Sequence, residues 1–172
     1  WAGFVYFLYI FFFFLGSFVS SFLVELISKK TERNIYALPT SIEILILLVI
    51  GIFGGDFIIN NPNSIACGLL FAMGLQNSLV TKISNATVRT THLTGLFTDL
   101  GIELSQLFFY KEPEKKQKLF SSIKLRMTII SFFFIGGVVG GICYTKMQLK
   151  VLVIASVALI VGLIYDNIKL KI

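Results

Sequence analysis

A chain of 172 residues in which 56% are hydrophobic and only 14% are charged cannot coat a soluble globule of this size with polar side chains. Its 18 Phe residues, its mean hydropathy of +0.87 and its net charge of +6 instead suit apolar helices in lipid with basic loops near anionic headgroups. These values exclude a soluble enzyme, a nucleic-acid binder and a disordered chain.

Apolar runs of the length that a bilayer-spanning helix needs, about 20 residues, recur along the chain. They predict an all-α, polytopic transmembrane bundle with five or six helical segments. Charged loops are expected at 29–33 and 111–118, and a turn at 60–64. The acidic residues Glu43, Asp56 and Asp166 lie near segment ends, where we expect them to face the membrane interface. The predicted segments are 2–28, 41–59, 65–81, 88–110, 127–145 and 149–165.

Two stretches 120 positions apart share one pattern: FFFLGSFVSS at 12–21 and FFFIGGVVGG at 132–141. Each is followed by a basic loop and another apolar segment, which predicts an internal repeat within one membrane domain, with 1–60 a partial first copy and 65–172 the second. The alternative is chance similarity between two Phe- and Gly-rich helices. The segments at 65–110 have no counterpart before residue 12, and Trp1 is not an initiating Met. We therefore expect the N-terminal part of the first repeat to be missing, and no signal peptide.

Small residues recur four positions apart in both copies of the repeat, at Gly16 and Ser20 and at Gly136 and Gly140, with Gly141 beside the second pair. This spacing places them on one stripe of a helix, where two backbones can approach closely. We interpret them as helix-packing positions. A substrate path lined by glycines is the alternative.

Polar side chains concentrate in the segment 76–106. If 88–110 is a helix, the only His, His92, shares a face with Asp99 and Glu103. Charge within a membrane is costly, so inside a bundle this face would mark an ion, proton or substrate path. A helix lying at the membrane surface and a structural ion pair that locks two helices are the alternatives. The predicted path residues are Gln76, Asn77, Arg89, Thr91, His92, Thr94, Asp99 and Glu103.

The chain shows no nucleophile–base pair, no nucleotide-binding motif and no metal-ligand spacing. We therefore expect no catalytic residues, no metal and no cofactor, and we do not expect an enzyme. Membrane lipid, a small-molecule or ion substrate, and a homo-oligomer or larger membrane complex are the expected partners, and nucleic acid is not. If all six segments cross the membrane, Lys and Arg number seven on one side and eight on the other, so the positive-inside rule leaves the orientation open.

The run GLQNSLVTKIS at 74–84, followed by VRTTHLTGLFTDLGIEL at 88–104, resembles the signature of the YoaK-type family of bacterial inner-membrane proteins of unknown function. The stretch YALP at 36–39 with Glu43, and FFLGSF at 13–18, are similar to the family as well. The resemblance implies a multi-pass protein of the bacterial inner membrane. Family members usually carry an additional N-terminal helix with a second motif similar to 91–95, which is absent here.

Two functional hypotheses follow from these features. The first is a transporter or channel for a small molecule or ion, with its path at the repeat interface and along 76–106. In that hypothesis Asp99 and Glu103 handle cations or protons, while Arg89 and the start of its helix handle anionic groups. The second is a non-transporting accessory subunit that is held in a larger membrane complex by its Gly- and Phe-rich helix faces.

Overall fold

The computed structural model describes residues 2–29, 35–83 and 93–169, except for the side chains at 2, 56–60, 167 and 169. Every regular element within these ranges is helical, which confirms the predicted all-α fold. A short 3-10 turn, η1 (Gln148–Lys150), joins the last two helices. The helices are α1 (Ala2–Ser28), α2 (Ala37–Asn60), α3 (Pro62–Ile83), α4 (Leu93–Phe109), α5 (Pro113–Met147) and α6 (Val151–Lys169).

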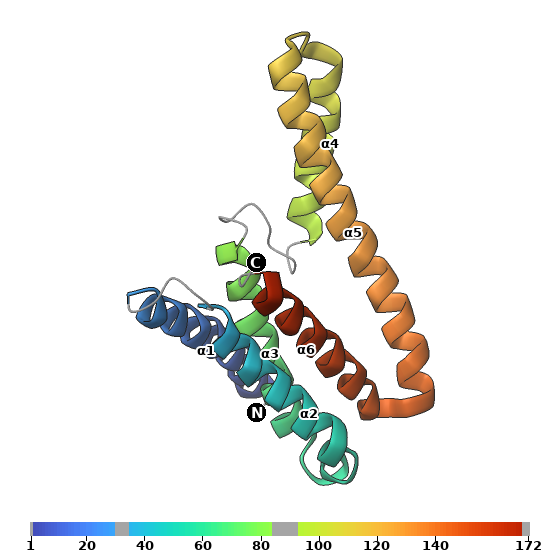
Figure 1. The fold of residues 1–172 in the computed structure, drawn as a ribbon. Helices are drawn as coiled ribbons and strands as arrows, with labels where there is room; N and C mark the ends of the chain where they lie inside the picture. Colours follow the sequence, from blue (N-terminus) through green and yellow to red (C-terminus); the bar gives the residue numbers. More distant parts are fainter. Residues whose placement is uncertain (1, 30–34, 84–92, 170–172) are drawn as a thin grey trace.

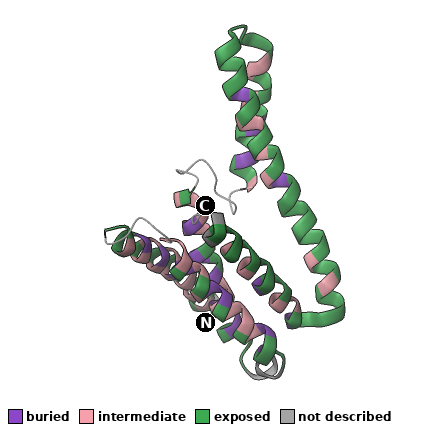
Figure 2. Cartoon of the chain, in the orientation of Figure 1, coloured by how far each residue is buried: buried purple, intermediate pink, exposed green. Residues whose placement is uncertain are grey.

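Helices α1, α2, α3 and α6 pack together into a bundle, while α4 and the first half of α5 form a hairpin that projects beyond it (Figure 1). Within the described residues, four helical stretches are long and apolar enough to cross a membrane: Gly3–Ser28, Ala37–Gly55, Pro62–Ile83, and the continuous stretch Pro113–Asp166, which contains α5 and most of α6. Many residues of these helices are exposed (Figure 2), and a large share of the exposed ones carry large apolar side chains. Such surfaces suit lipid, so the chain is a multi-pass membrane protein.

The most extensive contact in the bundle joins α1 and α3, which run parallel. Near their N-terminal ends the Tyr9 hydroxyl donates a hydrogen bond to Asn63 Oδ1 at 2.7 Å. Near their C-terminal ends Lys82 Nζ lies 2.6 Å from Glu25 Oε1. Because both polar contacts join like ends, they hold the two helices in one register.

Between those ends the backbones of α1 and α3 touch at two glycines. A Cβ atom added to Gly16 would overlap the carbonyl oxygen of Phe71, and one added to Gly74 would overlap the carbonyl oxygen of Phe13. The Ser17 hydroxyl also donates a hydrogen bond to the Gly74 carbonyl at 3.1 Å. The crossing therefore depends on the missing side chain at both positions.

Helix α2 begins four residues earlier than its predicted segment 41–59. Pro39 is buried in its first turn, where a missing N–H is tolerated. The Ser41 hydroxyl donates to the Ala37 carbonyl at 2.8 Å and the Thr40 hydroxyl to the Tyr36 carbonyl at 2.9 Å. Both side chains therefore hydrogen-bond to backbone carbonyls four residues earlier, around the first turn of the helix.

The predicted charged loop at 111–118 is wrong from Pro113 onward, because α5 already begins there. Proline suits the first position of a helix, and the Glu112 carbonyl accepts a hydrogen bond from the Lys116 N–H at 3.0 Å. The full helix of 35 residues is about 52 Å long, whereas the hydrocarbon core of a bilayer is about 30 Å thick. One end of α5 therefore extends well past the apolar layer.

Candidate functional site

Two adjoining cavities, of about 450 and 550 Å³, lie between α2, α3 and α6 and share Ala158 and Leu159 in their walls. We call them together the acidic groove. Polar side chains lie along it, and its other lining residues are aliphatic except for Met73 and Gly162. The polar residues are Glu43 and Gln76 in the smaller cavity, called inner because it lies farther from the ends of the helices, and Tyr36, Thr40 and Asp166 in the larger, outer cavity. Both cavities open to the surface, and Gln76 and Ala158 in the wall of the inner one are exposed.

Helical spacing explains how the sequence forms this groove. Thr40, Glu43 and Leu47 follow one another at intervals of three or four residues along a single face of α2, and Tyr36, directly before the helix, continues this spacing. On the opposite side α6 contributes small side chains, including Ala158, and so leaves space between the helices.

Glu43 is the most unusual member of the groove. Its side chain belongs to the span Ala37–Gly55, and the residue is only 4% exposed. No other residue that the structure describes forms a hydrogen bond or ion pair with its carboxyl group. The sequence led us to expect Glu43 to face the membrane interface, whereas the structure buries it among neighbouring helices in the second turn of α2.

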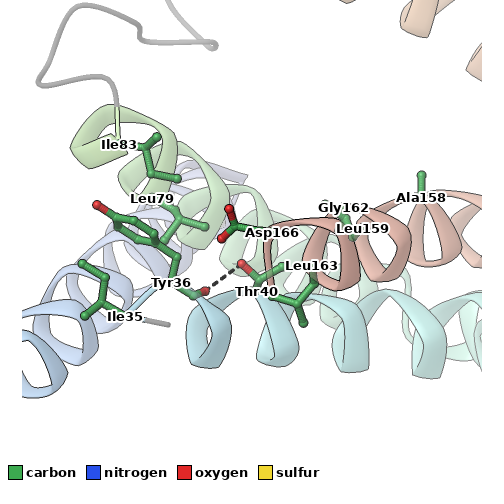
Figure 3. Close-up of a pocket in the computed structure, with 10 residues that line it drawn as sticks. All are labelled: Ile35, Tyr36, Thr40, Leu79, Ile83, Ala158, Leu159, Gly162, Leu163 and Asp166. Carbon is green, nitrogen blue, oxygen red and sulfur yellow. Dashed lines mark hydrogen bonds between the residues drawn. The ribbon is translucent and has the colours of Figure 1, made fainter. Parts of the chain in front are cut away.

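The outer cavity lies at the end of the bundle where α2 begins and where α3 and α6 end. Figure 3 shows Asp166 of α6 near Thr40 of α2 and near Tyr36, which directly precedes α2, and the aliphatic residues Leu79 and Ile83 of α3 line the same cavity. Asp166 is exposed, so it lies at the mouth of the groove, whereas Glu43 lies within it.

A second polar cluster joins α4 to α5. Arg126 Nη1 donates to Asp99 Oδ2 at 2.8 Å, and its Nε donates to Glu103 Oε2 at 3.1 Å. The Ser122 hydroxyl donates to the other oxygen of Glu103 at 2.7 Å. Leu96, Leu100 and Ile130 are buried beside the cluster. This arrangement is an ion pair that locks two helices, and its cation is Arg126.

Sequence reasoning missed Arg126 and Glu43. Arg126 was assigned to the region before the segment 127–145, although its spacing of four from Ser122 places both on one face if the helix extends upstream. Glu43 was recognisable only as a carboxylate flanked by apolar residues, and its burial depends on contacts with α3 and α6 that the α2 sequence does not contain.

The predicted path residues are not gathered in one place among the described residues. Gln76 lines the inner cavity, while Asn77 is half-buried on α3 and its carbonyl accepts the Thr81 hydroxyl at 2.7 Å. Thr94 is exposed in the first turn of α4. Asp99 and Glu103 face Arg126 and line neither cavity of the groove. The remaining three, Arg89, Thr91 and His92, lie outside the described residues.

The predicted packing residues have different surroundings in the two copies of the predicted repeat. Gly16 lies against the α3 backbone, and Ser20 is fully buried. At Gly136, Gly140 and Gly141 of α5, an added Cβ would have no neighbour within 4 Å among the described atoms beyond their own helix. Packing at these three positions stays a prediction.

Metal-binding clusters are not found in the described part of the chain, where no three His, Cys, Asp or Glu side chains are close enough to share an ion. Both cysteines, Cys67 and Cys143, are free thiols.

The helical spans and the lipid-suited surface define a multi-pass helical membrane protein. The chain belongs to the family described as protein of unknown function (DUF1275), whose model matches residues 1–165. No curated protein and no solved structure matches the chain.

Proposed function

We propose that the protein is a transporter or channel for a small molecule or ion in the bacterial inner membrane, and that it is not an enzyme. The observation that carries this proposal is Glu43, a carboxylic acid almost completely buried inside a membrane span and lining a cavity. The resemblance to the YoaK-type family supports the inner membrane as its location.

A carboxyl group inside the hydrocarbon layer is costly, and such groups usually mark ion, proton or substrate pathways. Glu43 lies in a groove with Gln76, one of the predicted path residues, and the groove continues past Ala158 to Asp166 at the end of the bundle. The path proposed for the segment 76–106 therefore begins at Gln76 and passes along α2 and α6 instead of following α4.

The test is flux through the purified protein in proteoliposomes. Currents on a solid-supported membrane are recorded against a panel of inorganic ions, protons, amines, amino acids and carboxylates. We expect at least one member to give a current in the wild type, and the isosteric change Glu43→Gln to reduce it at least about tenfold because the buried charge is lost. Glu114→Gln removes an exposed acid on α5 and serves as the matched control.

A current of equal size in Glu43→Gln and wild type would separate transport from the groove and refute the proposal as stated. No current for any member, with protein that is folded and correctly inserted, would favour the accessory subunit. That second function is supported by the glycines of α5, which lack a described neighbour. It predicts that Gly140→Leu lowers the assembled mass measured in mild detergent.

A further inference from the structure

We infer that the acidic groove binds a monovalent organic cation with an apolar body, of the quaternary ammonium or phosphonium type. This inference rests on the proposed function and names its substrate class. It is carried by the charge of the groove, by the nature of its walls and by the small number of oxygen ligands inside it.

Among the described residues, the side chains that line the groove and can carry a charge near neutral pH are both carboxylic acids. These acids are Glu43 and Asp166, and neither Lys nor Arg appears among the described residues that line the two cavities. Glu43 is buried with no described partner, so a bound cation would supply the opposite charge that a desolvated carboxylate needs. An anionic substrate would have to enter against both acids.

The walls and size of the groove suit an organic ion. The inner cavity measures about 450 Å³, and outside Glu43 and Gln76 its lining consists of Leu, Ala and Met side chains. Cavities of about 300–1,000 Å³ with mostly apolar walls and few polar groups are typical of small-molecule sites. The aliphatic surface would cover the body of the ligand while Glu43 faces its charge.

The side chains of the same cavity are less suitable ligands for an inorganic cation. Hard cations in proteins take about six to eight oxygen ligands, or fewer when they keep part of their water shell. Glu43 and Gln76 are the only described side chains that supply oxygen to the inner cavity. A dehydrated metal ion would therefore meet mostly methyl and methylene groups, which cannot replace its water.

The test is a binding measurement with two ions of the same shape and opposite charge. Tetraphenylphosphonium and tetraphenylborate are each titrated into the full chain in nanodiscs, and the uptake of empty nanodiscs is subtracted. We expect saturable binding of the phosphonium alone. Glu43→Gln should weaken it at least about thirtyfold, because a buried charge pair loses one partner. Asp166→Asn should change it about twofold or less, because an exposed pair contributes little.

Two further variants keep this test independent of folding defects. Glu114→Gln removes an acid far from the groove and should leave phosphonium binding unchanged. Ala158→Phe fills the wall shared by both cavities while Glu43 keeps its charge, and it should abolish binding. Each variant is first compared with the wild type by thermal unfolding in the same nanodiscs.

Equal uptake of both tetraphenyl ions, or phosphonium binding that is the same in Glu43→Gln, would show partition into lipid and overturn the inference. Displacement of the phosphonium by Na⁺ or K⁺ at millimolar concentration would point to an inorganic cation site. That result would also overturn the substrate class, while leaving transport through Glu43 intact. Conversely, Glu43-dependent binding without any flux in proteoliposomes would keep the site and refute the transport function.

Discussion

The guanidinium of Arg126 contacts both carboxylates of the α4 face, but the two contacts differ in their surroundings. The side chains of Arg126 and Glu103 are 14% and 16% exposed, whereas that of Asp99 is 51% exposed. Solvent weakens the Asp99 pair to a contribution of about 0–1 kcal/mol. The Glu103 pair, with its added hydrogen bond from Ser122, lies largely out of water and holds the hairpin together.

Removing the charge of Arg126 should therefore loosen α4 from α5. We expect Arg126→Gln to destabilise the hairpin by about 2 kcal/mol, because Glu103 would remain partly buried without its cation. Lys124→Gln removes an equal charge from an exposed position on the same helix and should have almost no effect. The measurement is hydrogen exchange of the α4 backbone amides in both variants, and we expect the amides to lose protection in Arg126→Gln alone. Equal protection in the two variants would contradict a specific role for Arg126.

At the scale of the helices, one pattern recurs in three of them. In this pattern a Phe is followed by Gly three positions later and by Ser or Gly four positions after that. It occurs at 13–20 in α1, 71–78 in α3 and 133–140 in α5. The first two copies pack against each other, with each glycine against the carbonyl of the other helix's Phe. The third copy lies on a face of α5 without a described neighbour. The spacing therefore predicts that a helix face can pack closely against another helix. It does not predict whether another helix lies there.

The matched glycines of α1 and α5 allow this difference to be tested. Gly16→Ala should lower the stability of the protein by about 2 kcal/mol or more, because the added methyl group meets a backbone carbonyl that cannot move aside. Gly136→Ala adds the same group in open space and should leave stability unchanged or raise it by up to about 1 kcal/mol through helix propensity. Thermal unfolding in one detergent measures both. A loss of equal size at Gly136 would show that another helix packs there.

The sequence predicts features that depend on residues close together in the chain better than features that depend on contacts between separate helices. Apolar length alone located the helices, because each must satisfy its backbone hydrogen bonds within lipid. The start of α5 was misplaced because a charged run around Pro113 resembles a loop, although the same residues suit a helix that extends beyond the membrane. The groove around Glu43 was not predictable, since its walls come from three helices whose contacts no local pattern specifies.

For the whole molecule, the position of α4 changes the balance of charge across the membrane. Counting 65–81 and 88–110 as separate crossings gave nearly equal numbers of basic residues on the two sides. In the structure α4 instead continues past the end of the bundle at which α3 ends, and the basic first half of α5 lies beside it (Figure 1). Eight of the ten described Lys and Arg side chains lie toward this end: Lys29, Lys82, Lys111, Lys115, Lys116, Lys118, Lys124 and Arg126. Lys146 and Lys150 lie toward the other end.

This distribution predicts an orientation, because basic residues near the ends of spans tend to remain in the cytoplasm. We expect the α4–α5 hairpin and the mouth of the groove at Asp166 to face the cytoplasm, and the junction of α2 and α3 to face the opposite side. Single cysteines at the exposed positions Asn61 and Ser121 test this in a background with Cys67→Ser and Cys143→Ser. In intact cells a membrane-impermeant maleimide should label Asn61→Cys, and it should label Ser121→Cys only after permeabilisation. The reverse pattern would place the hairpin outside the cell, with the acidic groove opening there as well.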